Sequence, residues 1–191
     1  MSRRSQALIA LAVLAIGIGA FGWWRSRQWD DRAIAWPSSR PPCDRFDLPV
    51  GPGYHDMLGF RVEDRLGLHL GNDWTADGAD NADLGAPVRA IAAGIVIDAR
   101  DIGGDWGNVV RVVHCDVEAV YAHLERIDVA IGATVKRGDP IGTLGNADGV
   151  YSDAHLHLEL RDRPLPLGGG YHDVGEDLTG YLDPARVLQQ R

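Results

Sequence analysis

Short apolar runs, separated by turn residues, occupy most of the chain from about residue 54 onward. They recur roughly every ten residues, and glycine, aspartate and asparagine lie between them. No sustained helical repeat interrupts this pattern, which is typical of antiparallel strands joined by hairpins. The sequence therefore predicts a mostly β fold, a compact antiparallel β-sheet domain, with strands at 87–98, 107–114, 118–124, 127–135, 140–144 and 154–161.

The C-terminal segments depart from this pattern. Residues 164–170 read PLPLGGG, which is too rich in proline and glycine for a central strand and predicts a loop. The wider segment 162–180 is either an ordinary connection or the wall of a cleft, and the sequence leaves both open. After Pro184 we expect a short closing helix at 185–188.

An uncharged apolar stretch at 7–24 precedes these runs. Eighteen helical residues span about 27 Å, close to the thickness of the hydrocarbon core of a bilayer. Arginines flank both ends, and Trp23 and Trp24 suit a membrane interface, so we favour an uncleaved signal anchor over residues 1–27. A cleaved signal peptide is the alternative, because 18–20 is a weak cleavage site. Either interpretation means that the chain is exported or anchored.

The part of the chain after this stretch is strongly acidic. The formal net charge is −8, but Arg3, Arg4, Arg25 and Arg27 are the charged residues of the first 27. The remainder therefore holds 15 basic and 27 acidic side chains, a net charge of −12. A nucleic-acid-binding domain needs a basic surface, so we expect no nucleic-acid partner.

A proline-rich segment joins the apolar stretch to the strands. We expect residues 28–45 to be a tether and residues 46–191 to form the domain. Cys43 lies in this tether, and Cys115 is the other cysteine of the chain. We favour two unpaired thiols, with a disulfide in an oxidising compartment as the alternative.

The run 155–160 alternates polar residues with leucine. In a strand, His155, His157 and Glu159 would share one face while the leucines share the core face. Two imidazoles on one face are explained either by a metal, since imidazole is a common zinc ligand, or by hydrogen-bonded surface histidines. A zinc site also needs a further ligand from elsewhere in the chain.

Candidates for that ligand lie earlier in the chain. His69 and Asp73 are four residues apart, a spacing that places them on one face of either a helix or a strand. His123 lies on another apolar run, where a lone histidine is more often a core residue than a functional one. Each of these signals is weak when taken alone.

Together, the motifs resemble the lysostaphin/LytM-type zinc metallopeptidases. The resemblance covers residues 46–161 and includes glycine-punctuated stretches at 85–96, 107–110 and 129–142. It rests on three motifs in order: His69-(three residues)-Asp73, Tyr121-Ala122-His123-Leu124 and His155-Leu156-His157.

This resemblance implies one Zn²⁺ per chain, held by His69, Asp73 and His157. His155 would act as the general base, and His123 would stabilise the oxyanion or share in proton transfer. Zinc lowers the pKa of a bound water to about 7, which matches a histidine base. The implied fold is a compact antiparallel β-sheet domain, in agreement with the strand pattern.

The implied activity is a zinc metalloendopeptidase that cuts peptide bonds in bacterial peptidoglycan. The enzyme would lie in the cell envelope, in the periplasm or outside the membrane, and would contact the cytoplasmic (inner) membrane through its N-terminal helix. A non-catalytic module of the same fold, which binds peptidoglycan or activates a wall hydrolase, is the alternative. Such members typically lose ligands or the catalytic histidine, whereas this chain keeps all the corresponding residues.

Several other residues remain weaker candidates. The loop 146–154 departs from the Ser/Thr/Gly-rich loop of the family, which leaves the bond specificity open. For Glu159 we favour a solvated strand-end carboxylate over a role in orienting a ligand. For Trp74 and Trp106 we favour packing over substrate stacking, and for His114 a hairpin end over a metal site.

Overall fold

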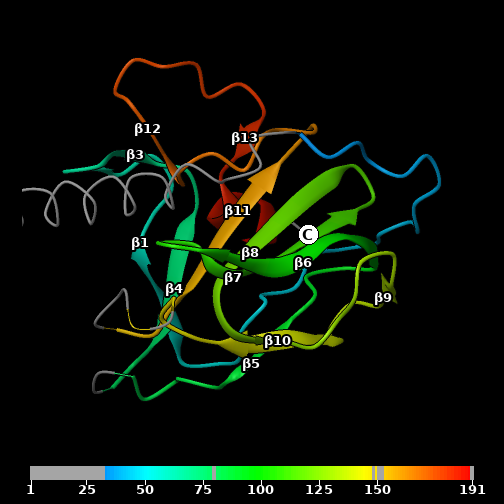
Figure 1. Ribbon diagram of the computed structural model, residues 1–191, viewed down its shortest axis with the longest axis horizontal. Helices are drawn as coiled ribbons and strands as arrows, with labels where there is room; N and C mark the ends of the chain where they lie inside the picture. Colours follow the sequence, from blue (N-terminus) through cyan, green and yellow to red (C-terminus); the bar gives the residue numbers. More distant parts are fainter. Residues whose placement is uncertain (1–32, 79–80, 148, 150–152, 190–191) are drawn as a thin grey trace, which may run out of the picture. The chain divides into compact units, whose positions relative to one another are not determined.

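Ten antiparallel strands form the main sheet in the computed structural model, which describes residues 33–78, 81–147, 149 and 153–189 (Figure 1). Its path runs β1-β4-β11-β8-β7-β6-β9, with β10 paired to β5 and β8 and with β13 paired to β11. A smaller sheet has the order β12-β3-β2. The prediction of a mostly β, antiparallel fold is confirmed.

The elements have the following bounds: β1 (Tyr54–Leu58), β2 (Glu63–Asp64), β3 (Gly67–His69), β4 (Asn72–Ala76), β5 (Pro87–Arg89), β6 (Gly94–Gly103), β7 (Gly107–His114), β8 (Val117–Ile127), β9 (Thr134–Val135), β10 (Pro140–Leu144), β11 (Leu156–Arg161), β12 (Tyr171–His172), β13 (Tyr181–Leu182) and α2 (Pro184–Gln189). The loop at 164–170 and the closing helix agree with the sequence pattern. Two predicted strands do not: the run 87–98 is divided into β5 and the start of β6 by residues 90–93, and only the ends of 127–135 belong to strands.

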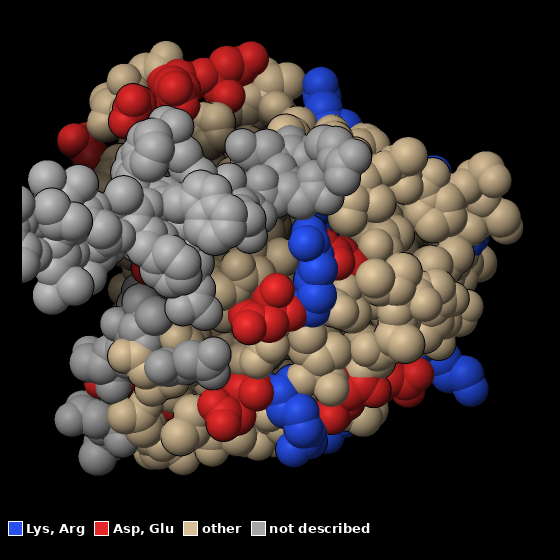
Figure 2. Space-filling model, viewed as in Figure 1, with Lys and Arg blue, Asp and Glu red and all other residues tan. Residues whose placement is uncertain are grey.

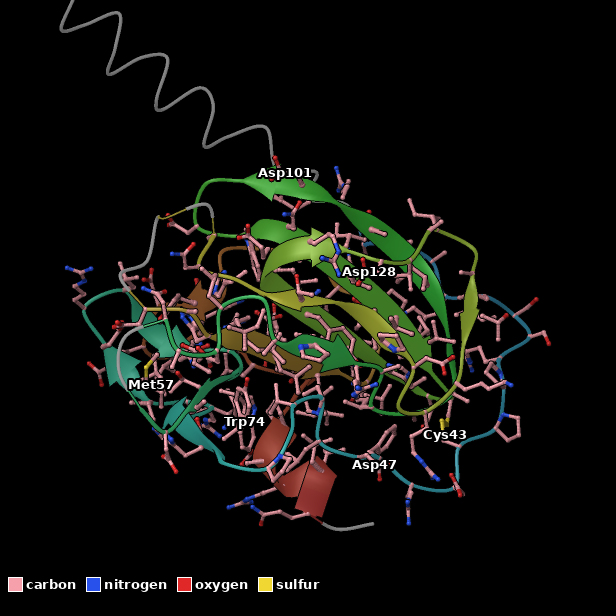
Figure 3. The ribbon with its side chains drawn as sticks, turned by 90° about the horizontal axis from the view of Figure 1, so that it is seen from below. Cys43, Asp47, Met57, Trp74, Asp101 and Asp128 are labelled. Carbon is pink, nitrogen blue, oxygen red and sulfur yellow. A yellow bond between two sulfur atoms is a disulfide. The ribbon has the colours of Figure 1, made fainter. Side chains whose placement is uncertain are left out.

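The core lies on the leucine face of β11. The side chains of Leu156, Leu158 and Leu160 are fully buried and pack in one cluster with the apolar residues of β7 and β8. Trp74 joins this cluster, so the packing interpretation holds for it (Figure 3). Because strands alternate, burying these leucines turns His157 and Glu159 to the opposite face.

The segment before the domain contacts the β7–β8 hairpin. Cys43 and Cys115 form a disulfide, with Cα atoms 5.8 Å apart, so the favoured interpretation of two unpaired thiols is wrong (Figure 3). Trp36 Nε1 donates a hydrogen bond of 2.8 Å to Glu118 Oε2. Arg137 Nη1 donates one of 2.8 Å to Asp44 Oδ1. The described part of the predicted tether is therefore held against the domain.

No helix in the described part of the chain is both long and apolar enough to cross a membrane. The predicted anchor at 7–24 lies outside the described residues.

Acidic side chains gather over the segment between β12 and β13, where Asp173, Glu176 and Asp177 are exposed (Figure 2).

Candidate metal centre

Three strands bring the predicted ligands to one point. Asp73 on β4 and His157 on β11 are direct partners in the antiparallel register. His69 ends β3, in the smaller sheet, and Leu70 and Gly71 carry the chain from there into β4. All three side chains are almost fully buried. The sheet pairing thus joins residues that lie more than eighty positions apart in the sequence.

The three donor atoms form a tight triangle. His157 Nδ1 lies 2.9 Å from Asp73 Oδ1 and 3.0 Å from His69 Nε2, and His69 Nε2 lies 3.3 Å from Asp73 Oδ1. Ligands about 2.0 Å from a tetrahedral zinc stand ~3.3 Å apart. Two imidazole nitrogens and a carboxylate are also a donor set that zinc accepts. Both the spacing and the chemistry of this group fit zinc.

The charges within this triangle stabilise one another. Burial opposes a charge on Asp73, but hydrogen bonds from His157 and His69 hold the pKa of this carboxyl well below its usual range. Burial also opposes a charge on His157, yet hydrogen bonds to Asp73 and Glu159 raise the pKa of its imidazole to about 9. The carboxylate is therefore ionised and ready to act as a ligand.

His155 and His123 stand beside the triangle. Their ring centroids are 4.7 Å apart, and His155 Nε2 lies 4.0 Å from Asp73 Oδ2. The Nδ1 atoms of both rings face carbonyl oxygens: that of Asp153 at 3.0 Å from His155, and that of Trp106 at 3.3 Å from His123. An Nδ1–H that donates to a carbonyl leaves Nε2 as the basic atom of the ring.

A β-bulge directs His123. Between the pairs Asn108↔Leu124 and Val110↔Tyr121, β8 contains one more residue than β7. His123 lies at this bulge with a φ of 62°, an uncommon conformation for a residue with a side chain. Burial, and then the electrostatic effect of the neighbouring imidazoles of His155 and His157, hold the pKa of His123 well below its usual value. Its ring is therefore neutral near pH 7.

Two stretches wall the pocket around these groups; the sequence left the first open as an alternative and favoured packing for Trp106 in the second. Gly169, Gly170 and Tyr171 line it, so the segment 162–180 does wall a cleft. Asp105 and Trp106 line it from the β6–β7 turn. The glycines around Asp105-Trp106 do predict a turn at this point of the sequence. Their spacing does not predict that the turn lies against the histidines.

Of two weaker candidates, Glu159 has a different environment from the one predicted, whereas His114 does lie at the end of the β7–β8 hairpin. Glu159 is fully buried and accepts a hydrogen bond of 3.2 Å from His157 Nε2, so the expectation of a solvated strand-end carboxylate is wrong. The reason is that Arg161 neutralises its charge within the sheet. His114 is fully buried between Tyr121 and the carbonyl of Ala93, away from the metal candidate.

Comparison with known proteins identifies the family. The profile of peptidase family M23 matches residues 69–168, more than half of the chain and the span that holds all five predicted site residues. The chain belongs to peptidase family M23. M23 enzymes are zinc-dependent peptidases, so the resemblance seen in the motifs is confirmed at the level of the family.

The chain is 38% identical over 124 residues to the DD-carboxypeptidase/endopeptidase Mpg of Neisseria meningitidis, covering 64% of this chain and 26% of Mpg. It is 32% identical over 130 residues to the peptidoglycan DD-endopeptidase ShyB of Vibrio cholerae, covering 66% and 29%. The chain thus spans between a quarter and a third of the length of these two relatives.

A solved M23 structure has the same fold. The catalytic domain of the antimicrobial peptidase lysostaphin from Staphylococcus simulans superposes with a TM-score of 0.52 and 25% identity, covering 71% of this chain and 92% of that domain. Nearly the whole lysostaphin domain therefore has a counterpart here. The strands that carry the candidate metal centre lie almost wholly within the family match, which begins at His69.

Proposed function

We propose that this M23 protein is a zinc metalloendopeptidase that hydrolyses peptide bonds in bacterial peptidoglycan. The observation that carries the proposal is the triangle of His69 Nε2, Asp73 Oδ1 and His157 Nδ1, with two further histidines in the same pocket. When bound there, zinc supplies Lewis acidity, which polarises a peptide carbonyl and lowers the pKa of a water to about 7.

His155 is the general base in this proposal. Its Nε2 is the ring atom toward Asp73, and its Nδ1 is held by the Asp153 carbonyl, so the ring is oriented to accept a proton beside the triangle. His155 would then return this proton to the leaving amine. A positioned general base contributes about 10²–10⁴-fold to the rate.

His123 shares in proton transfer in this proposal and becomes the oxyanion donor once its Nε2 carries a proton. The resting ring is neutral, lies against His155 and is directed by the bulge and by the carbonyl of Trp106, which accepts from Nδ1. A pre-oriented donor needs no reorganisation when negative charge develops on the carbonyl oxygen, and one such donor is worth about 10²–10³ in kcat.

The substrate and the location rest on relatives and on sequence. ShyB is named a peptidoglycan DD-endopeptidase, and the apolar stretch at 7–24 suits export or anchoring in the envelope. We therefore place the enzyme in the bacterial envelope, attached to the cytoplasmic membrane, with its domain outside that membrane. The domain at 46–191 and the tether at 28–45 remain the proposed organisation.

The proposal is tested by digesting purified muropeptides with the full chain, after metal removal and after zinc reconstitution. We expect cleavage with zinc, none without it, and none for Asp73→Ala. His55→Ala is the matched control, since His55 is an exposed histidine paired with Asp77. Intact muropeptides with the zinc-loaded protein, together with zinc-independent stimulation of a separate hydrolase, would support the non-catalytic alternative instead.

A further inference from the structure

Four charged side chains are buried behind the candidate metal centre. Arg111 on β7, Glu118 on β8, and Glu159 and Arg161 on β11 are each at most 1% exposed, and we call them the buried charge network. Arg161 lies directly opposite Glu118 in the β11–β8 register. Buried charges are costly unless they are paired and hydrogen-bonded, so a network of this kind needs a structural or a functional reason.

One arm of the network reaches the candidate ligand His157. Glu159 Oε1 accepts from His157 Nε2 at 3.2 Å, and Glu159 Oε2 accepts from Arg161 Nε at 3.0 Å and from Arg161 Nη2. The carboxylate therefore bridges the imidazole and the guanidinium. Holding a proton at Nε2 makes Nδ1, the nitrogen in the donor triangle, the atom that gives up its proton when a metal binds.

The other arm reaches the wall of the pocket. Arg161 Nη2 donates to the carbonyl of Leu167 at 3.0 Å, and Nη1 donates to that of Leu165 at 3.3 Å. The next carbonyl along, that of Gly168, accepts from Trp106 Nε1 at 2.9 Å. Gly169 and Gly170, which follow immediately, line the pocket. The same guanidinium thus fixes both the carboxylate behind His157 and the start of the wall.

We propose that Glu159 and Arg161 are positioning residues: Glu159 fixes the orientation and tautomer of His157, and Arg161 fixes Glu159 together with the loop that walls the pocket. This inference rests on the proposed function, in which His157 holds zinc. Loss of either residue weakens zinc binding and changes the geometry at the metal while the fold is kept.

Arg111 provides a matched control. Like Arg161, it is a buried arginine that is paired with Glu118 and donates to the carbonyl of Leu165. Arg111 hydrogen-bonds Glu118 directly and reaches the Leu165 carbonyl at 3.0 Å. Among the described residues, none of its hydrogen bonds goes to Glu159. If the buried charge network served stability alone, Arg111→Lys and Arg161→Lys would have the same consequences at the metal.

The experiment compares Arg161→Lys, Glu159→Gln and Arg111→Lys in the full chain. Zinc affinity is measured by competition with a chelator, the geometry by visible absorption of the cobalt(II)-substituted proteins, and folding by near-ultraviolet circular dichroism. Altered partners of metal-bound histidines typically cost about 10–100-fold in affinity. We expect a loss of this size and a shifted cobalt spectrum for Arg161→Lys and Glu159→Gln, and neither change for Arg111→Lys.

Equal zinc affinities and equal cobalt spectra in all three variants and the parent would overturn the inference. If Arg161→Lys does not fold, Glu159→Gln decides, because it is isosteric but its single amide oxygen cannot take the place of both carboxylate oxygens, one facing His157 and the other facing Arg161. A parent that binds zinc and shows the expected pattern, but cuts no muropeptide, would contradict the proposed activity and leave the positioning role intact. A parent that binds no zinc would overturn both.

Discussion

Gly71 lies where the chain passes close to the imidazole of His157. A Cβ atom on Gly71 would lie 2.9 Å from His157 Cε1 and 2.5 Å from the carbonyl oxygen of Leu158. The first neighbour is part of the candidate centre and the second is backbone in β11, so neither can move without disturbing the pairing of β4 with β11. Close approach, and not an unusual φ, is the reason for glycine here.

We predict that Gly71→Ala destabilises the protein by about 1–3 kcal/mol, the usual range for overpacking, and lowers its zinc content. Gly51→Ala is the control, because a Cβ on Gly51 meets nothing within 4 Å. Thermal unfolding and metal analysis of the two purified variants check this. Equal unfolding midpoints for both variants would show that the contact at Gly71 is not tight.

For single residues, the sequence predicted which side chains form the site better than it predicted what surrounds them. Alternation placed His155, His157 and Glu159 on one face because a strand has a period of two. It could not show that Glu159 is buried, since burial depends on Arg161 and on the neighbouring strand β8. The joining of His69 to His157 came from the resemblance to a family, because no local pattern determines which strands become neighbours.

Among the elements, the β7–β8 hairpin ends in a buried polar chain. His114 Nδ1 faces the carbonyl of Ala93 at 3.2 Å, and its Nε2 faces the hydroxyl of Tyr121 at 3.0 Å. That hydroxyl accepts from the backbone N–H of Ile91 at 3.0 Å. A neutral His114, with its proton on Nδ1, satisfies every group in this chain. Burial lowers the pKa of His114 to about 4.

This gives a pH dependence of stability. In the unfolded chain His114 titrates near 6.5, so between about pH 6.5 and about pH 4 the unfolded state binds a proton that the folded state does not. The stability that His114 contributes is therefore complete above pH 6.5 and decreases as the pH falls towards 4, by about 3 kcal/mol in total.

The measurement compares urea unfolding of the parent and of His114→Asn at pH 7, 5.5 and 4. Asparagine cannot titrate in this range, so we expect the variant to be less stable at pH 7 but to lose less stability on acidification. Parallel losses in the two proteins would mean that other groups cause the acid sensitivity.

Strand boundaries were predictable where the turn chemistry was explicit. The runs 107–114 and 140–144 coincide with β7 and β10 because glycine or aspartate bounds them. The run 127–135 failed because Gly132 adopts a φ of 84° within a turn, in which the N–H of Ala133 donates to the carbonyl of Ala130. Periodicity alone cannot distinguish such a turn from a continued strand.

For the whole molecule, the disulfide shows that the proline-rich segment is covalently joined to the β7–β8 hairpin. The Cys43–Cys115 bond closes a loop with a sequence separation of 72. Composition predicted a tether from proline content, yet it could not show that Trp36 and Asp44 also contact the domain. These contacts are long-range, so proline-rich composition is uninformative about them.

We predict that replacing both cysteines by serine lowers the free energy of unfolding by at most about 4 kcal/mol, the loop-closure value for this separation. The remaining contacts of Trp36 and Asp44 reduce the loss. Unfolding of the parent with and without reductant should show the same difference as the double variant. A reductant effect that persists in the double variant would contradict a role for this bond.

The apolar stretch at 7–24 predicts attachment of the full chain to membranes. We expect the full chain to sediment with the membrane fraction and to resist extraction by high salt, whereas the 28–191 fragment should remain in the supernatant. Salt-extractable full chain would exclude an anchor, and a processed N-terminus found by mass spectrometry would favour the cleaved signal peptide.

In the proposed mechanism His157 holds the zinc and His155 takes the proton from its water, and one paired measurement separates these two roles. Zinc content and muropeptide turnover are determined for His155→Ala and His157→Ala in the full chain. We predict that His155→Ala keeps one zinc per chain and loses turnover by at least about 10²-fold, whereas His157→Ala loses both. Loss of zinc in His155→Ala, or turnover that survives in His157→Ala, would contradict the account.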